Sequence, residues 1–176
     1  MKSTFTLITV VLILICPLGL SVEPTRKVVA KKSIGHAELY WLLNRACCDG
    51  DEIGVKMLLD AGADPNGIED YKAFRRFEPS WPINQASWDG HLEVIELLLQ
   101  AGAKVDFPEG EGFTALLIAT MRNHPKVVAR LVLAGADTNY KGPGGTALAV
   151  ARAKGFSEIV QILETANASP KPVPRK

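Results

Sequence analysis

The chain contains little cysteine and no excess of charge of either sign. Three cysteines in 176 residues are too few for a disulfide scaffold. The 20 Lys and Arg nearly balance the 19 Asp and Glu, so the basic excess typical of proteins that bind nucleic acid or an anionic membrane is missing. Charged residues at 22%, with 15 Gly and 11 Pro, are near globular averages, which excludes a wholly disordered or fibrous chain. The length suits one domain with a real core.

A long hydrophobic run is present only at the N-terminus, from Phe5 to Ile15. A positive charge precedes it, and Pro17 and small residues follow it. This layout predicts a signal peptide over residues 1–21, and hence a secreted or periplasmic protein with no stable membrane insertion after cleavage. An uncleaved anchor and a lipid attachment at Cys16 remain as alternatives.

Two series of similar segments recur along the rest of the chain. The first series contains Ala-Gly-Ala, with its glycine at Gly62, Gly102 and Gly135. The second series closes at Gly50, Gly90, Asn123 and Gly155, with spacings of 40, 33 and 32 residues. Both series indicate one insertion of seven residues between Asn66 and Trp81. A repeat of about 33 residues therefore organises the domain.

Each unit predicts two short helices joined by a tight turn. The first helix carries small residues, and the Gly or Asn after it supplies the positive φ that the turn needs. The second helix carries apolar residues at three- and four-residue spacing. These residues are Val55, Leu58, Leu59, Val94, Ile95, Leu97, Leu98, Val127, Val128, Leu131, Val132, Ile159, Val160, Ile162 and Leu163.

These segments resemble the ankyrin repeat. Residues 90–103, with the sequence Gly-His-Leu-Glu-Val-Ile-Glu-Leu-Leu-Leu-Gln-Ala-Gly-Ala, match the second half of that repeat closely. Its opening Thr-Pro-Leu-His is matched loosely by residues 114–117 and 146–149. Trp41 and Trp81 stand where the family has its capping threonine, so the hydroxyl cap is missing in the first two units. The resemblance implies an all-α ankyrin-repeat solenoid of about four helix-turn-helix units with short finger loops.

The predicted ankyrin repeat domain spans residues 36–167. Its units are placed at about 37–66, 78–106, 111–139 and 143–166, and residues 67–80 form an inserted loop. A linker over residues 22–35 precedes the domain. Residues 168–176, rich in Pro and Lys, predict a disordered tail because alternating prolines forbid a helix.

Histidine and cysteine invite a chemical interpretation. His91 and His124 are 33 residues apart at equivalent places of adjacent units, which the resemblance explains as a turn element rather than as metal ligands. Cys47 occupies the small, buried position of its helix and is expected to pack there. Cys48 takes an exposed position and is a candidate reactive thiol, although no histidine partner is placed beside it.

Two loops have the composition of ligand-binding segments. Residues 141–146 are rich in glycine but lack the Gly-Lys-Ser/Thr ending of a phosphate loop, so a finger turn is the better interpretation. Residues 109–112 place two acids in another finger, where a solvated turn is favoured over a calcium site. The sequence therefore predicts no catalytic site, no cofactor and no metal.

What remains is a surface for recognition. The resemblance implies binding through the fingers and through the exposed ends of the first helices. The predicted protein-binding residues are Trp88, Asp89, Met121 and Arg122 at helix ends, Glu111 and Phe113 in a finger, and Tyr71, Arg75, Arg76 and Phe77 in the inserted loop. Aromatic residues and arginine often anchor interfaces. For any one of these anchors, contact with a neighbouring finger is an equally good interpretation.

The predicted function is that of an exported, monomeric interaction module without catalytic activity. It would bind a protein partner, and no nucleic acid, through the concave face, the finger loops and the inserted loop. Two alternatives remain. The first is a small exported enzyme that uses the Cys48 thiol or the acidic fingers. The second is a secreted effector that acts on a host protein.

Overall fold

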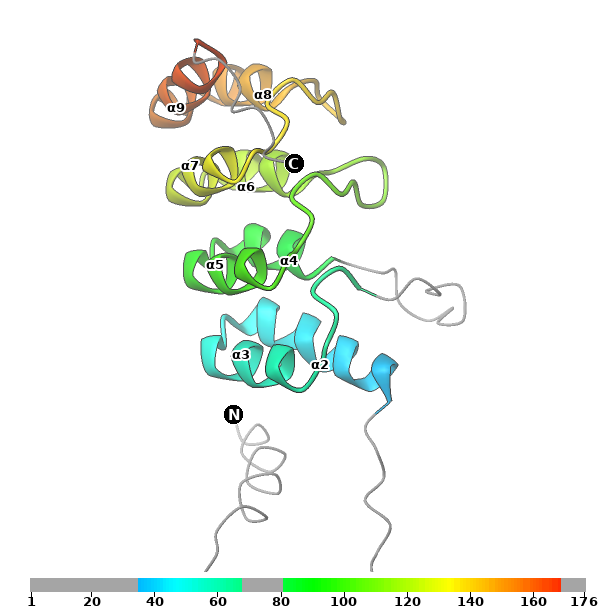
Figure 1. The fold of residues 1–176 in the computed structure, drawn as a ribbon. Helices are drawn as coiled ribbons and strands as arrows, with labels where there is room; N and C mark the ends of the chain where they lie inside the picture. Colours follow the sequence, from blue (N-terminus) through cyan, green and yellow to red (C-terminus); the bar gives the residue numbers. More distant parts are fainter. Residues whose placement is uncertain (1–34, 68–80, 169–176) are drawn as a thin grey trace, which may run out of the picture. The chain divides into compact units, whose positions relative to one another are not determined.

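The computed structural model describes residues 35–67 and 81–168, in which the helices form consecutive pairs (Figure 1). The pairs are α2 (His36–Asp49) with α3 (Glu52–Asp60), α4 (Pro82–Asp89) with α5 (Leu92–Gln100), α6 (Ala115–Met121) with α7 (Pro125–Leu133), and α8 (Ala147–Lys154) with α9 (Ser157–Ala168). We number these pairs as units one to four. Apart from two isolated β-bridges, the described residues form no strand pairing. The predicted all-α solenoid is confirmed.

The four units stack so that the helices form two layers. The first helices α2, α4, α6 and α8 contact one another in that order, and the second helices α3, α5, α7 and α9 do the same (Figure 1). Each unit leaves one apolar side uncovered when alone, so burial depends on the neighbouring unit. No helix in the described part of the chain is long and apolar enough to cross a membrane.

The turn inside each unit has the left-handed backbone that the sequence predicts. The φ angle is 69° at Gly50, 81° at Gly90 and 74° at Gly155. Asn123 takes this place in unit three with a φ of 61°. Asparagine tolerates the conformation better than other residues that carry a Cβ. The predicted register of helix and turn is therefore confirmed.

The core lies between the two layers and between successive units. On the first helices, Cys47, Ala86, Ala119 and Ala151 are completely buried, and their short side chains let neighbouring helices approach closely. On the second helices, buried side chains recur at the predicted spacing: Val55, Val94, Ile95, Leu98, Val127, Val128, Leu131, Ile159 and Leu163. Full burial of one such branched side chain stabilises the fold by about 1.5–3 kcal/mol.

The starts of the first helices differ between units. Thr114 Oγ1 accepts a hydrogen bond from Leu117 N at 3.4 Å, and Thr146 Oγ1 accepts one from Ala149 N at 3.2 Å. These are the hydroxyl caps that the resemblance implies for units three and four. Trp81 starts α4 with no side-chain cap, as expected.

The position of Trp41 differs from the prediction. We expected Trp41 at the start of the first helix of unit one, but α2 begins at His36 and Trp41 lies inside it. Gly35 N donates to the Glu38 carboxylate at 3.3 Å, so an acid in the first turn satisfies the helix start.

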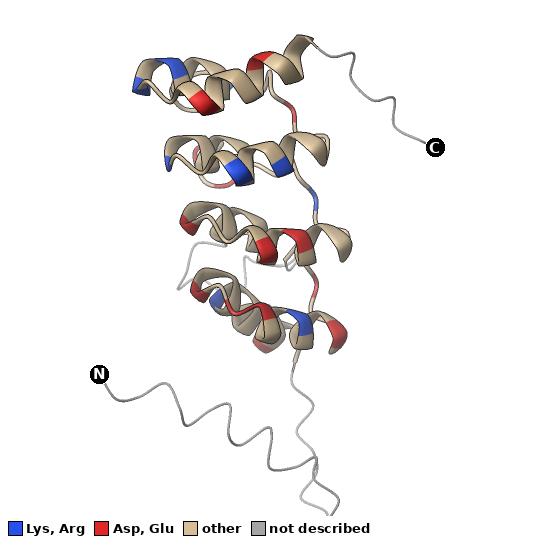
Figure 2. Cartoon of the chain, turned by 90° about the vertical axis from the view of Figure 1, so that its left-hand side faces the viewer, with Lys and Arg blue, Asp and Glu red and all other residues tan. Residues whose placement is uncertain are grey.

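The charge of the second helices changes sign between the neighbours α5 and α7. Figure 2 colours the acidic positions of α5 red and the basic positions of α7 blue. The acids are Glu93 and Glu96, and the bases are Lys126 and Arg130. Arg130 Nε lies 3.6 Å from Glu96 Oε1, which joins units two and three on this side of the stack.

Several predicted segments lie outside the described residues. These are the signal peptide, residues 22–34 of the linker, residues 68–80 of the inserted loop and residues 169–176 of the tail. The loop residues Tyr71, Arg75, Arg76 and Phe77 belong to this part, so their predicted role in binding stays a prediction.

Candidate functional site

An exposed, charged residue stands directly before the turn of every unit. These residues are Asp49, Asp89, Arg122 and Lys154. Because the units stack in register, these four side chains occupy equivalent places along the stack, and we call them the charged row. One position earlier stand Cys48, Trp88, Met121 and Ala153.

Trp88 of unit two and Arg122 of unit three pack against each other. The guanidinium carbon of Arg122 lies 4.6 Å from the centre of a Trp88 ring, and Arg122 Nε donates to the Trp88 carbonyl at 3.3 Å. A cation above an indole face is attracted by the negative face of the ring. Trp88 nevertheless stays 46% exposed. The pair is therefore held in place and still open to solvent.

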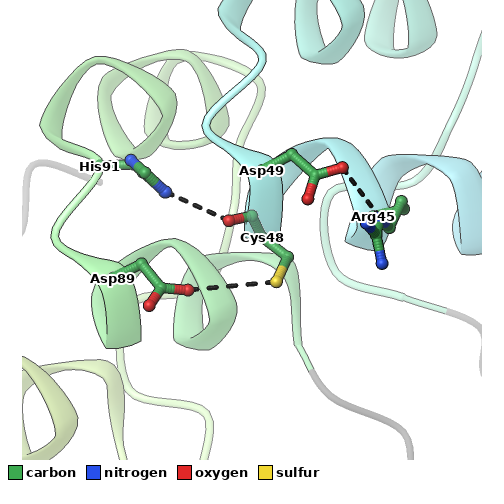
Figure 3. A network of polar contacts seen from close by, with 5 residues as sticks. All are labelled: Arg45, Cys48, Asp49, Asp89 and His91. Atoms are coloured by element: carbon green, nitrogen blue, oxygen red, sulfur yellow. Dashed lines mark hydrogen bonds and ion pairs between the residues drawn. The ribbon is translucent and has the colours of Figure 1, made fainter. Parts of the chain in front are cut away.

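An equivalent contact between neighbouring units joins Cys48 of unit one to Asp89 of unit two. Figure 3 shows the Cys48 thiol directed to the Asp89 carboxylate, with 4.0 Å between Sγ and Oδ2. On α2, Arg45 Nε donates to Asp49 Oδ2 at 2.8 Å. Asp49 thus has a cationic partner, whereas the neighbour of Asp89 is the Cys48 side chain.

Two histidines link the ends of the first helices across units. His91 Nε2 lies 3.1 Å from the Cys48 carbonyl oxygen (Figure 3), and His124 Nε2 lies 3.1 Å from the Trp88 carbonyl oxygen. Because a carbonyl only accepts, Nε2 must carry the proton in both rings. Unit four has Phe156 at the equivalent place, so it lacks this link.

The two histidine rings also lie against the turn glycines. A Cβ on Gly50 would come within 2.6 Å of the His91 ring, and a Cβ on Gly90 within 2.5 Å of His124 Nδ1. Gly155 has no atom within 4 Å of that position. Glycine is therefore needed at 50 and 90 both for its backbone conformation and for the close approach of the ring.

The two cysteines have the contrasting environments that the sequence predicts. Cys47 is completely buried, and this burial raises the pKa of its thiol to about 12, with a further contribution from Cys48. Cys48 is exposed and free. His91 bonds to the backbone carbonyl of Cys48, so its ring is not paired with the thiol.

The fingers bring a second group of side chains to the first helices. Asn84, which is 1% exposed on α4, donates through Nδ2 to Glu109 Oε2 at 3.0 Å. The rings of Trp81 and Phe107 pack against each other at an angle of 35°, with their centres 3.7 Å apart. Burial raises the pKa of Tyr40, and the nearby Glu109 charge raises it further, although a hydrogen bond from Asn44 lowers it. Glu109 thus ties a finger to the layer of first helices.

The structure brings together only part of the predicted set. Trp88, Asp89, Met121 and Arg122 gather at the turn ends of α4 and α6, but Met121 is half-buried and packs against the core. Glu111 is exposed in the finger of unit three, whose turn closes with a bridge between Glu109 and Phe113. Phe113 itself is half-buried.

Sequence reasoning missed the histidine links and the contacts of Asn84. His91 and His124 each follow the turn residue of positive φ, Gly90 and Asn123, and this shared place points to a repeated role but does not reveal the acceptor. Residues 81–84, Trp-Pro-Ile-Asn, take the place of the Thr-Pro-Leu-His motif, so Asn84 replaces its histidine. This place in the motif gives no indication of the bond from Asn84 to Glu109. Within the described ranges, no three His, Cys, Asp or Glu side chains lie close enough together to hold a metal ion.

Comparison with known proteins identifies the repeat. A family model for ankyrin repeats, in three copies, matches residues 83–172, which is just over half of the chain. This range covers the three helix pairs from α4 to α9, and α2 and α3 precede it. A search of curated proteins finds no match.

Proposed function

We propose that this chain, which belongs to the ankyrin repeat family, binds a protein partner through the surface around Trp88 and Arg122. Ankyrin repeats indicate a protein–protein interaction module. The stacked pair of Trp88 and Arg122 is the observation that supports this surface. Tryptophan and arginine are enriched among residues that dominate binding energy, and a side chain already held in place loses less entropy on binding.

The test begins with a partner captured from the compartment in which the protein resides. Calorimetry then compares the affinities of wild type and Trp88→Ala for that partner. Loss of a hot-spot tryptophan costs about 2 kcal/mol or more, so we expect the affinity to fall about 30-fold. The melting temperature should change little, because Trp88 is half-exposed.

Glu93→Ala provides the matched control. Glu93 is exposed on α5, in the layer of second helices. We expect this variant to bind like wild type. Wild-type affinity for Trp88→Ala together with impaired binding by Glu93→Ala would place the partner on the second helices and contradict the proposal.

We further propose that the module is exported and has no catalytic activity of its own. The hydrophobic run from Phe5 to Ile15 supports export, and N-terminal sequencing of the native protein tests it. A chain that begins near Val22 is expected, and an intact Met1 on a cytosolic product would contradict export. The absence of a thiol–imidazole pair at Cys48, among the residues described, favours binding over thiol catalysis.

A further inference from the structure

The formal charge of the stack changes sign from one end to the other. Residues 35–67 contain six acidic and two basic side chains. Residues 81–106 contain four acidic side chains and one basic side chain. Residues 107–139 contain three of each, and residues 140–168 contain two acidic and three basic side chains. The four units therefore carry formal charges of −4, −3, 0 and +1 in order.

The charged row repeats this order on a single surface. It runs from Asp49 and Asp89 in units one and two to Arg122 and Lys154 in units three and four. Among the described residues, no opposite charge lies within ion-pair distance of Asp89, Arg122 or Lys154. None of these three charges is therefore neutralised by an ion pair within the described ranges.

Neighbouring charges on the same helices are already paired. Arg45 binds Asp49, and Arg152 Nη2 lies 2.6 Å from Glu164 Oε1. The Lys154 ammonium lies 6.0 Å from the centre of the Phe156 ring and not beside an acid. Arg45 is thus paired with Asp49 of the row and Arg152 with Glu164, whereas Asp89, Arg122 and Lys154 form no ion pair within the described ranges.

We propose that the charged row fixes the direction of the bound partner, whose basic side chains lie over units one and two and whose acidic side chains lie over units three and four. This inference rests on the proposed function, because it describes the partner of the same surface. Complementary charges contribute mainly to orientation and specificity, and the reversed orientation would set like charges against each other.

The length of the row sets the length of the partner segment. Packed helices lie about 8–10 Å apart, so three steps from unit one to unit four cover about 30 Å. An extended chain advances about 3.3 Å per residue. A segment of about nine residues therefore spans the row, with its basic and acidic ends separated by the Trp88–Arg122 pair.

A synthetic peptide tests the direction. The probe is a 12-residue peptide with three lysines in one half, three glutamates in the other, serine between them, and a nitroxide label at the glutamate end. We expect this label to broaden the amide NMR signals of α8 in the ¹⁵N-labelled full chain and to leave those of α2 sharp. Stronger broadening of α2, equal broadening of both helices, or no binding at low salt would overturn the inference.

Two charge-reversal variants test whether the charged row, and not the net charge of the protein, determines the affinity for the peptide. Asp89→Lys and Glu93→Lys change the net charge equally, but only Asp89 belongs to the row. We expect Asp89→Lys to weaken binding of the peptide by about fivefold or more and Glu93→Lys to leave it nearly unchanged. Equal weakening would assign the effect to the overall field and would overturn the role of the row.

The two proposals fail in different ways. If the peptide binds without a preferred direction but Trp88→Ala still weakens binding of the native partner, the inference about charge is contradicted. The proposed function then still stands. Wild-type binding of the native partner by Trp88→Ala contradicts the proposed function instead.

Discussion

Thr114 and Thr120 are two buried threonines of the third unit, and their hydroxyl groups differ in hydrogen bonding. Thr114 is 1% exposed and caps α6, whereas Thr120 is completely buried inside α6. Thr114 Oγ1 accepts from Leu117 N, but Thr120 Oγ1 has no partner among the described residues. A buried hydroxyl without a hydrogen bond lowers stability, because it loses its bonds to water without replacement.

Substitution of valine for each threonine should therefore have opposite effects. Thr114→Val removes a cap and should lower the free energy of unfolding by about 1 kcal/mol. Thr120→Val removes an unsatisfied hydroxyl at similar volume and should raise that free energy by up to about 1 kcal/mol. Urea unfolding of both variants measures the two changes. Destabilisation by both substitutions would show that the Thr120 hydroxyl is satisfied in solution.

The turn between the two helices of a unit combines a backbone requirement with a contact from the next unit. Gly90 and Gly155 both have positive φ angles, 81° and 74°, so an added Cβ strains both turns. Only Gly90 also faces a ring, that of His124. Gly155 is therefore a matched control in which the contact is missing.

Alanine at these two glycines should separate the two effects. Gly155→Ala should lower the free energy of unfolding by about 1–2 kcal/mol, the cost of a left-handed backbone with a Cβ. Gly90→Ala should cost more, because its Cβ meets the ring. In a His124→Ala background, the loss of unfolding free energy caused by Gly90→Ala should fall to the loss caused by Gly155→Ala. A double-mutant cycle measures this coupling between Gly90 and His124. Additive effects would show that the ring moves aside freely.

The sequence predicts the helices of each unit better than the contacts between units. Helix and turn positions follow from local patterns: the spacing of apolar residues and a Gly or Asn with positive φ. The link from His124 to the Trp88 carbonyl and the stacking of Arg122 on Trp88 join residues 34–36 positions apart. Such pairs depend on how one unit rests on another, which the pattern within a single unit does not specify. The early start of α2 at His36 was missed because the repeat pattern places a capping residue at Trp41.

At the scale of the whole molecule, the joints between units are not equivalent. Units two and three are joined by the His124 link, the Arg122–Trp88 contact, the Glu96–Arg130 ion pair and a bond from Asp137 N to Asp106. Unit four lacks the histidine link, and Thr138 Oγ1 donates to Asn167 Oδ1 between units three and four. In a repeat stack, stability is approximately the sum of unit and joint contributions, so the weaker joint should open first.

Hydrogen exchange should therefore reveal an order of opening along the stack. We expect the amides of α8 and α9 to exchange through an opening of lower free energy than those of α4 to α7, because no histidine link holds unit four. His124→Ala should remove the link between units two and three and bring the protection of α4 to α7 down towards that of unit four. His36→Ala serves as a control, since His36 is exposed at the start of α2 and has no hydrogen bond to another unit within residues 35–67 and 81–168. Mass spectrometry of exchanged peptides measures these opening free energies. Equal protection from α2 to α9 in the wild type, unchanged by His124→Ala, would mean that the four units open as one and that the histidine link contributes nothing to the joint.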